Sequence, residues 1–333
     1  MILTYKVKHD RDFSGELAQA RLVAEYAIIN RDKLSSKYVS HIGLKSVIAN
    51  QILRKYGRNK KAKSVNSVNL VIPNQGIKYK DDNVFISSLK LDLHTYKPLK
   101  KINQIEIDSE YAYISGEVPE KSPYKPETHI GVDLNTTGHC AVVAIKETGK
   151  VYKLGKPAHH NHNKYKNIRR MLQKKRHYKV VKRVKHRESN IIKNINHHIS
   201  RFIVDLAVRL KGEIHLEKLE GIRNSRKGRK SFKYALHSWS FYQLGKFIEY
   251  KALLAGVPVT YDNPSYTSKV CSKCGVIGER NGKIFKCLNG HVEHADSNAA
   301  FNLALPSNSL VQLQAERDVC KRSTDTRREA TFK

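Results

Sequence analysis

The sequence predicts an α/β protein made of two folded parts, and three features of the hydrophobic pattern support this. Apolar residues recur with a helical period over residues 14–56 and with a period of two from about residue 68. Beyond residue 127, short apolar strands alternate with long helical segments, which is typical of an α/β sheet. The chain has 333 residues, 40% of them hydrophobic, enough for two or three modest cores.

Residues 14–56 are expected to form two helices. The apolar residues that share one face are Leu17, Ala20, Ala24, Ala27 and Ile28 in the first helix and Leu44, Val47, Ile48 and Ile52 in the second. Lys and Arg cover the other faces and the following segment GRNKKAK. The pattern therefore predicts two helices with a basic surface.

The next segment predicts an antiparallel β unit, which we expect to close into a small barrel. Its alternating apolar runs are Ile77/Tyr79, Val84/Ile86, Leu89/Leu91/Leu93, Ile105/Ile107 and Tyr111/Tyr113. Asp81-Asp82-Asn83 is a hairpin turn signal between two of these runs. The segment PEKSPYKPE, residues 119–127, contains three prolines and is typical of a linker.

The second domain is expected to begin with two strands, HIGVDLN at residues 129–135 and CAVVAI at residues 140–145. A basic helical region spans about residues 164–210 and leads into the strand EIHLE. A helix near residues 239–254 and the strand VPVTY follow. This order indicates a sheet covered by helices.

The charge of the chain points to a polyanionic partner. Lys and Arg number 62 against 30 Asp and Glu, a formal net charge of +32. We expect nucleic acid and no membrane, because no apolar run approaches the roughly 18 residues of a membrane-spanning helix. The N-terminus MILTYKVKHD lacks the features of a signal peptide. The expected location is the reducing cytoplasm, where a disulfide framework is disfavoured.

The basic helical region has one apolar stripe and otherwise carries cations. Ile192, Ile195, Ile199, Phe202 and Leu206 alternate steps of three and four and should face a core. A solvated surface explains many charge runs, but cations with almost no acidic neighbours repel one another unless phosphates neutralise them. We therefore expect nucleic-acid contacts from Arg169, Arg170, Lys174, Lys175, Arg176, Lys179, Lys182 and Arg183.

Three acidic residues end strands or begin a helix in this domain. Asp133 lies in HIGVDLN, Glu217 ends EIHLE, and Asp296 precedes SNAAFNLA, where a helix dipole favours negative charge. Each alone has an ordinary explanation as a turn former, a cap or an exposed acid. Together they offer the hard oxygen ligands that a two-metal Mg²⁺ site needs for phosphodiester hydrolysis. We expect these three residues to be the catalytic, Mg²⁺-binding carboxylates.

The stretch CSKCGVIGERNGKIFKCLNGH has the spacing of a structural zinc site. Cys271, Cys274 and Cys287 supply three thiols, and His291 follows the last by four residues, which predicts a Cys₃His tetrahedral Zn²⁺ site. His294 as the fourth ligand, a three-cysteine site and a metal-free knuckle are the alternatives. A redox role for the CxxC pair is disfavoured because the thioredoxin-like strand and helix are missing.

Four motifs, GVDLN, LEKLEGI, YTSKVCSKCG and DSNAAFNLA, together with the helix WSFYQLGKFIEYKALLAG, resemble the TnpB (OrfB) family of transposon-encoded RNA-guided nucleases. This family is related to the compact type V CRISPR effectors. The resemblance implies a RuvC-like RNase H fold with a zinc-ribbon insert, preceded by a wedge β-barrel with a short helical recognition insert. The Asp, Glu and Asp of the family's nuclease motifs fall on Asp133, Glu217 and Asp296.

The resemblance also implies domain boundaries. These are 1–10 and 64–126 for the wedge barrel, 11–63 for the recognition insert, 127–266 and 296–306 for the nuclease domain, 267–295 for the zinc ribbon, and 307–333 for a flexible tail. The basic segment GIRNSRKGRKSFKY, residues 221–234, is either a lid over the site or a solvated loop.

The function implied by the resemblance is RNA-guided cleavage of DNA in a prokaryotic cell, at the nucleoid. The partners would be a structured guide RNA and a double-stranded DNA target with a short adjacent motif, while base pairing reads the sequence. Two alternatives remain: a nuclease-inactive RNA-guided regulator, and a guide-independent RuvC-like resolvase or transposase.

Overall fold

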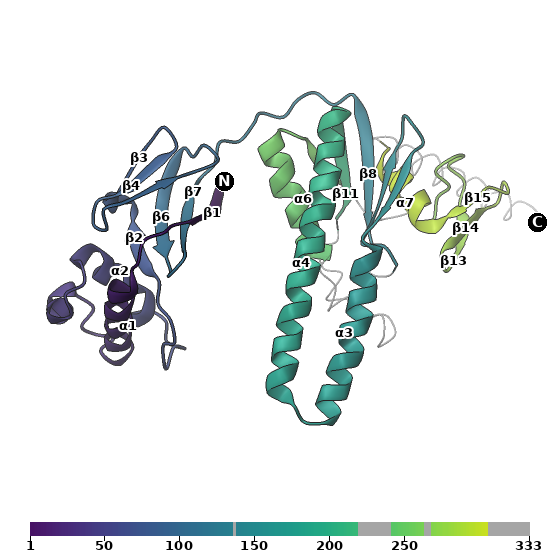
Figure 1. The fold of residues 1–333 in the computed structure, drawn as a ribbon. Helices are drawn as coiled ribbons and strands as arrows, with labels where there is room; N and C mark the ends of the chain where they lie inside the picture. The colour runs from purple at the N-terminus through teal and green to yellow at the C-terminus, as the bar shows by residue number, and fades with distance from the viewer. Residues whose placement is uncertain (136–137, 219–240, 263–267, 306–333) are drawn as a thin grey trace, which may run out of the picture. The chain divides into compact units, whose positions relative to one another are not determined.

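The structure is a computed structural model of the chain, and it describes residues 1–135, 138–218, 241–262 and 268–305 (Figure 1). The chain divides into two compact units, Met1–Glu120 and Lys121–Lys333. The division falls inside the proline-containing segment 119–127. The basic segment 221–234 and the tail 307–333 of the sequence analysis lie outside the described residues.

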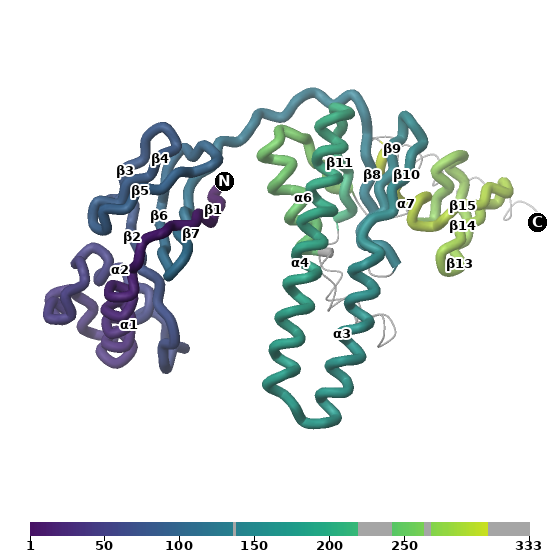
Figure 2. Tube along the Cα trace, in the orientation of Figure 1, coloured from purple at the N-terminus to yellow at the C-terminus, as the bar shows by residue number. Residues whose placement is uncertain are grey.

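The first unit contains two antiparallel sheets. Its strands are β1 Ile2–Lys8, β2 Leu70–Pro73, β3 Ile77–Lys80, β4 Asn83–Ile86, β5 Leu91–His94, β6 Lys101–Ile107 and β7 Tyr111–Glu117. The strand order is β1-β7-β6-β2 in the larger sheet and β3-β4-β5 in the smaller one (Figure 2). The hairpin turn predicted at Asp81-Asp82-Asn83 is present: Asp81 and Asp82 both have positive φ and form a two-residue turn, and Asn83 begins β4.

The expected closed barrel is wrong for these strands. All residues from 1 to 120 are described, and no hydrogen-bonded strand pair joins the two sheets. A short 3-10 helix, Asn74–Gly76, turns the chain between β2 and β3. As a result β3 pairs only with β4, and β2 remains an edge strand. A barrel requires a continuous ladder around its circumference, which these four-residue strands do not supply.

The helices of the first unit lie between β1 and β2 in the sequence, and both predicted helices are present. They are α1 Ser14–Ile29 and α2 Ser46–Gly57, with a 3-10 segment η1 Ser36–Ile42 between them. Ala20, Ala24 and Ala27 are fully buried, and their small side chains let α1 pack closely on α2. Ile48 and Ile52 of α2 are also fully buried, as their period predicts.

The second unit is built on a five-stranded mixed sheet. Its strands are β8 Thr128–Leu134, β9 Ala141–Ile145, β10 Val151–Leu154, β11 Gly212–Glu217 and β12 Val259–Asp262. Their order is β10-β9-β8-β11-β12; β8, β11 and β12 run parallel, and β9 is antiparallel to β8 and β10. Tyr124, at the end of the linker, donates its hydroxyl to the carbonyls of Ala207 and Gly212, which attaches the linker to this unit.

Helices cover both faces of the sheet. α4 Tyr178–Arg209 and α6 Phe241–Ala255 cover one face and α7 Ala295–Leu303 the other, while α3 Lys156–Lys174 packs along α4. Ile130 and Val132 of β8 share a core with α4 and α6, and this core includes the predicted stripe from Ile192 to Leu206. On the other face, Val142 and Ala144 pack against Ala300 of α7.

Gly131 allows α7 to approach the sheet backbone. A Cβ atom at this position would lie 1.9 Å from the carbonyl oxygen of Ala300 and 2.5 Å from the nitrogen of Ala304. Only glycine fits such a close backbone approach. The glycine of HIGVDLN therefore sets how closely α7, which carries Asp296, lies against β8, which carries Asp133.

A small antiparallel sheet precedes α7. Its strands are β13 Gly278–Asn281, β14 Ile284–Cys287 and β15 Val292–His294, in that order. The buried side chains of Asn298 and Asn302 on α7 donate to the carbonyl of Val270, each at 2.7 Å. These bonds tie the base of the cysteine-containing segment to the helix.

No helix within the described ranges has both the length and the apolar character needed to cross a bilayer.

Candidate active site and metal-ligating clusters

Three acidic side chains from distant segments approach one another beside the five-stranded sheet. The register pairs Leu216 with Val132, so Glu217 and Asp133 follow next to each other on neighbouring parallel strands. Asp296 is the second residue of α7 and lies on the side of the sheet that Gly131 opens. The structure thus brings together the three acids that the sequence singled out.

Burial and mutual repulsion shape the electrostatics of this site. Burial raises the pKa of Asp133 to about 6; Asp296 adds to the rise, and the side-chain amide of Asn135, 2.9 Å away, opposes it. Burial, followed by the charge of Asp133, raises the pKa of Glu217 to about 7. Negative charge on these two carboxylates is therefore costly without a nearby cation.

Asp296 already has two cationic partners. Its side chain is 1% exposed, Arg280 Nη2 lies 2.9 Å from Oδ1, and Lys283 Nζ lies 2.5 Å from Oδ2. Arg280 belongs to β13 and Lys283 to the turn that leads into β14. The sequence analysis missed both residues: they lie inside the cysteine-containing stretch, but neither is at a metal-ligand position and neither has a hydrophobic period that would mark it.

The donor set fits a hard divalent ion. Three carboxylates offer oxygen ligands, and the raised pKa values of Asp133 and Glu217 mean that a proton or a cation stabilises each of these two groups. In this arrangement, with Asp296 bound to Arg280 and Lys283, the three acids do not form a group whose ligand atoms all lie within 4.8 Å of one another.

A second cluster is formed by the cysteine-containing segment. The ligand atoms of Cys271, Cys274, Cys287 and His291 all lie within 4.8 Å of one another. His291 Nδ1 is 3.7 Å from Cys271 Sγ and 3.5 Å from Cys287 Sγ, and the sulfurs of Cys274 and Cys287 are 3.8 Å apart. Two thiolates that bind one zinc ion tetrahedrally at about 2.3 Å lie about 3.8 Å apart.

This geometry suits a Cys₃His metal site. His294, the alternative fourth ligand, is not part of the group. A hydrogen bond from the backbone N–H of Val276 lowers the pKa of Cys274 and so favours the thiolate that a metal binds. Phe285, 1% exposed, packs with Cys271, Cys287 and Ala295, so the segment has a small apolar core.

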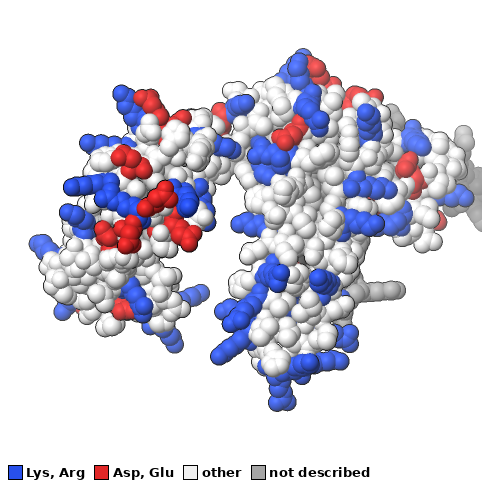
Figure 3. All heavy atoms as spheres, viewed as in Figure 1, with Lys and Arg blue, Asp and Glu red and all other residues white. Residues whose placement is uncertain are grey.

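The predicted cations occupy the α3–α4 helical hairpin (Figure 1). Arg170, Lys174, Lys175, Arg176, Lys179, Lys182 and Arg183 are exposed, and Figure 3 shows Lys and Arg side chains gathered around the end of this hairpin. Arg169 differs: its side chain is 15% exposed and forms an ion pair with Glu188, which also contacts His162. Arg169 thus joins the two helices. The other seven predicted cations are exposed, so a ligand can contact them.

The chain is similar to one protein-family model and to several known proteins. The Cas12f1-like, TNB domain family matches residues 241–303. The chain is 40% identical over 136 residues to "CRISPR-associated endodeoxyribonuclease Cas12f1" of Sulfoacidibacillus thermotolerans, and the alignment covers 39% of this chain and 30% of the relative. It is 30% identical over 237 residues to "TnpB-like protein aq_aa05" of Aquifex aeolicus, and the alignment covers 62% of this chain and 77% of the relative.

A solved structure described as "Cryo-EM structure of the Cas12f1-sgRNA-target DNA complex" aligns with a TM-score of 0.46 and 20% identity, over 92% of this chain and 99% of that one. The chain spans less than a third of the length of the Cas12f1 relative from Sulfoacidibacillus thermotolerans.

The raised pKa values predict an inverse pH dependence of stability. Between the ordinary carboxyl pKa and about 6 for Asp133 or about 7 for Glu217, the folded chain binds protons that the unfolded chain has released. Stability in Mg²⁺-free buffer should therefore fall as pH rises from about 4 to about 8. Asp133→Asn should flatten this fall in thermal unfolding scans.

Asp205→Asn, at a half-exposed position on α4, is the matched control and should leave the pH dependence unchanged. An identical slope in Asp133→Asn and the unmodified chain would contradict the burial argument.

Replacement of His291 should weaken metal binding by the cysteines. His291→Ala removes a direct ligand, so the affinity for Zn²⁺ should fall by more than the roughly 10–100-fold typical of losing an outer-shell partner. Zinc released on modification of the thiols measures this, with thermal unfolding as a second readout. His294→Ala is the control; if it lowers the zinc content and His291→Ala does not, the assignment of the fourth ligand is reversed.

Proposed function

The chain belongs to the TnpB-like family, and on that basis we propose that it is an RNA-guided DNA endonuclease. It would bind a structured guide RNA, recognise a short motif next to the target, and cut the target DNA by metal-dependent hydrolysis. The observation that carries the proposal is the approach of Asp133, Glu217 and Asp296 to one another in a chain of net charge +32. Buried acids in such a basic protein need a reason, and metal binding provides one.

Each acid has a proposed role in a RuvC-like site. Asp133, Glu217 and Asp296 would hold Mg²⁺ through carboxylate oxygens. When bound, the ions supply an activated water and stabilise the leaving oxygen of the phosphodiester. Arg280 and Lys283, which lie beside Asp296, would offer positive charge to the DNA phosphate as the carboxylate turns to the metal.

The exposed cations of the α3–α4 hairpin would hold nucleic-acid backbone. Phosphate contacts by Lys and Arg carry no sequence information, which agrees with a division of labour in which guide pairing reads the target. The Cys₃His cluster would bind a structural Zn²⁺ and stabilise the segment that presents Arg280 and Lys283. We assign the nuclease domain, the zinc ribbon and the recognition insert to the ranges given in the sequence analysis.

The proposal is tested with the full chain expressed from a locus that contains its flanking sequences. The RNA that co-purifies is sequenced, and the complex is incubated with Mg²⁺ and a plasmid library with randomised flanks. Cleavage should follow the sequence of the RNA and require one short flanking motif. Asp133→Ala should abolish cleavage but leave binding of the guided target intact.

The other outcomes separate the alternatives. Guided binding by both proteins with cleavage by neither would identify a nuclease-inactive regulator. Cleavage that needs no RNA would identify a guide-independent resolvase or transposase. If no discrete RNA co-purifies and no DNA is cut, the proposal is wrong.

The hairpin makes a separate prediction. Arg170→Ala/Lys174→Ala/Lys175→Ala should weaken RNA binding and reduce the slope of log affinity against log salt by about 0.7–0.9 per lost phosphate contact. Lys125→Ala/Lys146→Ala/Lys150→Ala removes the same charge from exposed positions outside the hairpin and should have a smaller effect. Equal slopes in the two variants would place the nucleic-acid contacts elsewhere.

A further inference from the structure

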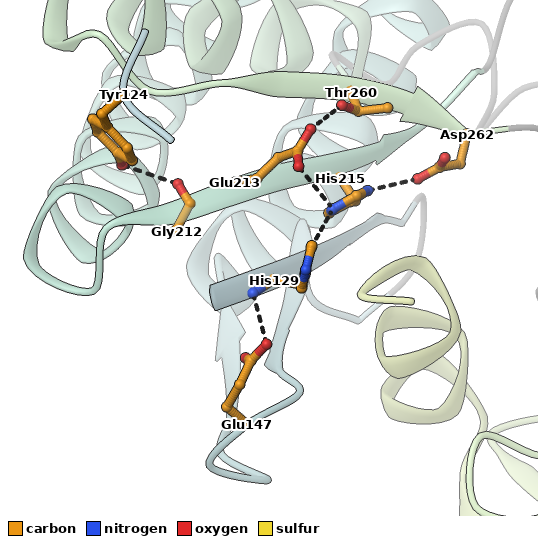
Figure 4. A network of polar contacts seen from close by, with 8 residues as sticks. All are labelled: Tyr124, His129, Glu147, Gly212, Glu213, His215, Thr260 and Asp262. Carbon is orange, nitrogen blue, oxygen red and sulfur yellow. Dashed lines mark hydrogen bonds and ion pairs between the residues drawn. The ribbon is translucent and has the colours of Figure 1, made fainter. Parts of the chain in front are cut away.

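A third group of ligand-type side chains lies on the sheet, apart from the acids and the cysteines. It consists of His129 on β8 and of Glu213 and His215 on β11, and their ligand atoms all lie within 4.8 Å of one another. Figure 4 shows the three side chains turned toward a common point. His129 Nδ1 is 3.2 Å from His215 Nε2, which in turn is 3.7 Å from Glu213 Oε2.

The strand register explains why these side chains meet. Glu213 pairs with His129, and His215 pairs with Gly131, so all three ligands lie on the same face of two adjacent strands. The side chain of His215 is 3% exposed and that of Glu213 is 18% exposed, so the group reaches solvent on one side.

The hydrogen bond between His215 and Asp262 determines which ring nitrogen of His215 bears a lone pair. His215 Nδ1 lies 3.0 Å from Asp262 Oδ2, and an ionised carboxylate only accepts, so Nδ1 carries the hydrogen. In the neutral ring, Nε2 then presents a lone pair to His129 Nδ1 and to the Glu213 carboxylate. A hydrogen on one of the two imidazole nitrogens, or a metal cation bound by all three ligand atoms, must therefore lie between them.

The surrounding residues fix the orientation of two of the ligands. Asp262, 5% exposed, orients His215 in the carboxylate–histidine–metal manner. The Thr260 hydroxyl donates to Glu213 Oε1 and leaves Oε2 facing His215. Figure 4 also shows Glu147, which accepts from the backbone N–H of His129 at 3.0 Å.

We propose that His129, Glu213 and His215 form a second transition-metal site, for a divalent ion of the zinc class. Two ligand atoms bound tetrahedrally at about 2.0–2.1 Å lie about 3.3 Å apart, close to the observed spacing. Two imidazoles and one carboxylate suit zinc and its neighbours and not Mg²⁺ or Ca²⁺. Three protein ligands leave one coordination position for water or another small ligand.

The site goes beyond the proposed function and does not depend on it. Its position has a structural consequence. Along β11, His215 is two residues, about 7 Å, from Glu217, and along β8, His129 is four residues, about 13 Å, from Asp133. Asp262, which orients His215, is also in register with Glu217. A bound ion would therefore link β8 and β11 directly beneath the carboxylate site.

The test counts metal ions in the full chain, loaded with Zn²⁺ in excess Mg²⁺ and dialysed. We expect two zinc ions per chain in the unmodified protein and one in His129→Gln and in Glu213→Gln, neither of which replaces a fully buried residue. Loading with Co²⁺ should give two absorption signatures, of which the one that lacks thiolate-to-cobalt charge transfer disappears in both variants. Asp262→Asn should lower the affinity for the second zinc ion by about 10–100-fold.

Two controls locate the second ion. His186→Gln, at an exposed position on α4, should retain both ions, as should Asp133→Asn. Three results would overturn the proposal: a single zinc ion in the unmodified chain, a second ion that persists in both His129→Gln and Glu213→Gln, or a second ion lost in Asp133→Asn. In the first case a shared proton, not a metal, holds the two imidazoles together.

Discussion

Parallel main-chain pairing of β8 with β11, and of β11 with β12, is the constraint on which the functional face of the second unit depends. In-register parallel strands point corresponding side chains to the same side. Asp133 and Glu217 thereby become neighbours, as do His129 and Glu213 and, on the next strand, Glu217 and Asp262. These polar side chains lie on one face of the sheet, and on the other face the core contains Ile130, Val132, Ile214 and Leu216.

The position of Asp296 depends on a second constraint, the contact of α7 with the sheet. Gly131 permits that contact, and Asn298 and Asn302 connect the same helix to the cysteine-containing segment. Because β15 ends at His294 and α7 begins at Ala295, the Cys₃His cluster and Asp296 belong to one continuous piece of structure. A metal ion at the cysteines would stabilise the hairpin that carries Arg280 and Lys283, and through it the surroundings of Asp296.

Charge is distributed differently in the two functional regions. At the acidic site, burial makes negative charge costly and favours a metal ion or a proton. On the α3–α4 hairpin, positive charge is exposed, and Glu188 neutralises Arg169 where the two helices meet. That ion pair is largely buried and joins the two helices, whereas the exposed cations repel one another and would be neutralised by the proposed nucleic acid.

Elements with a local signal were predictable from the amino-acid sequence alone. The period of α1, α2 and α4, the turn at Asp81-Asp82, the strands around Asp133 and Glu217, and the spacing of Cys271, Cys274, Cys287 and His291 follow from neighbours a few residues apart. The three acids were identifiable because each stands at the end of such an element. The family relationship was visible in the same motifs.

Contacts between residues far apart in the sequence were not predictable in this way, because they depend on how the elements pack. The two open sheets replaced the expected barrel because strand closure depends on long-range pairing. The ion pairs of Asp296 with Arg280 and Lys283, and that of Arg169 with Glu188, depend on how hairpins and helices fold onto one another. His129 and His215 are 86 residues apart in sequence and only 3.2 Å apart in space. No local pattern encodes that contact, because it exists only once β8 and β11 have paired.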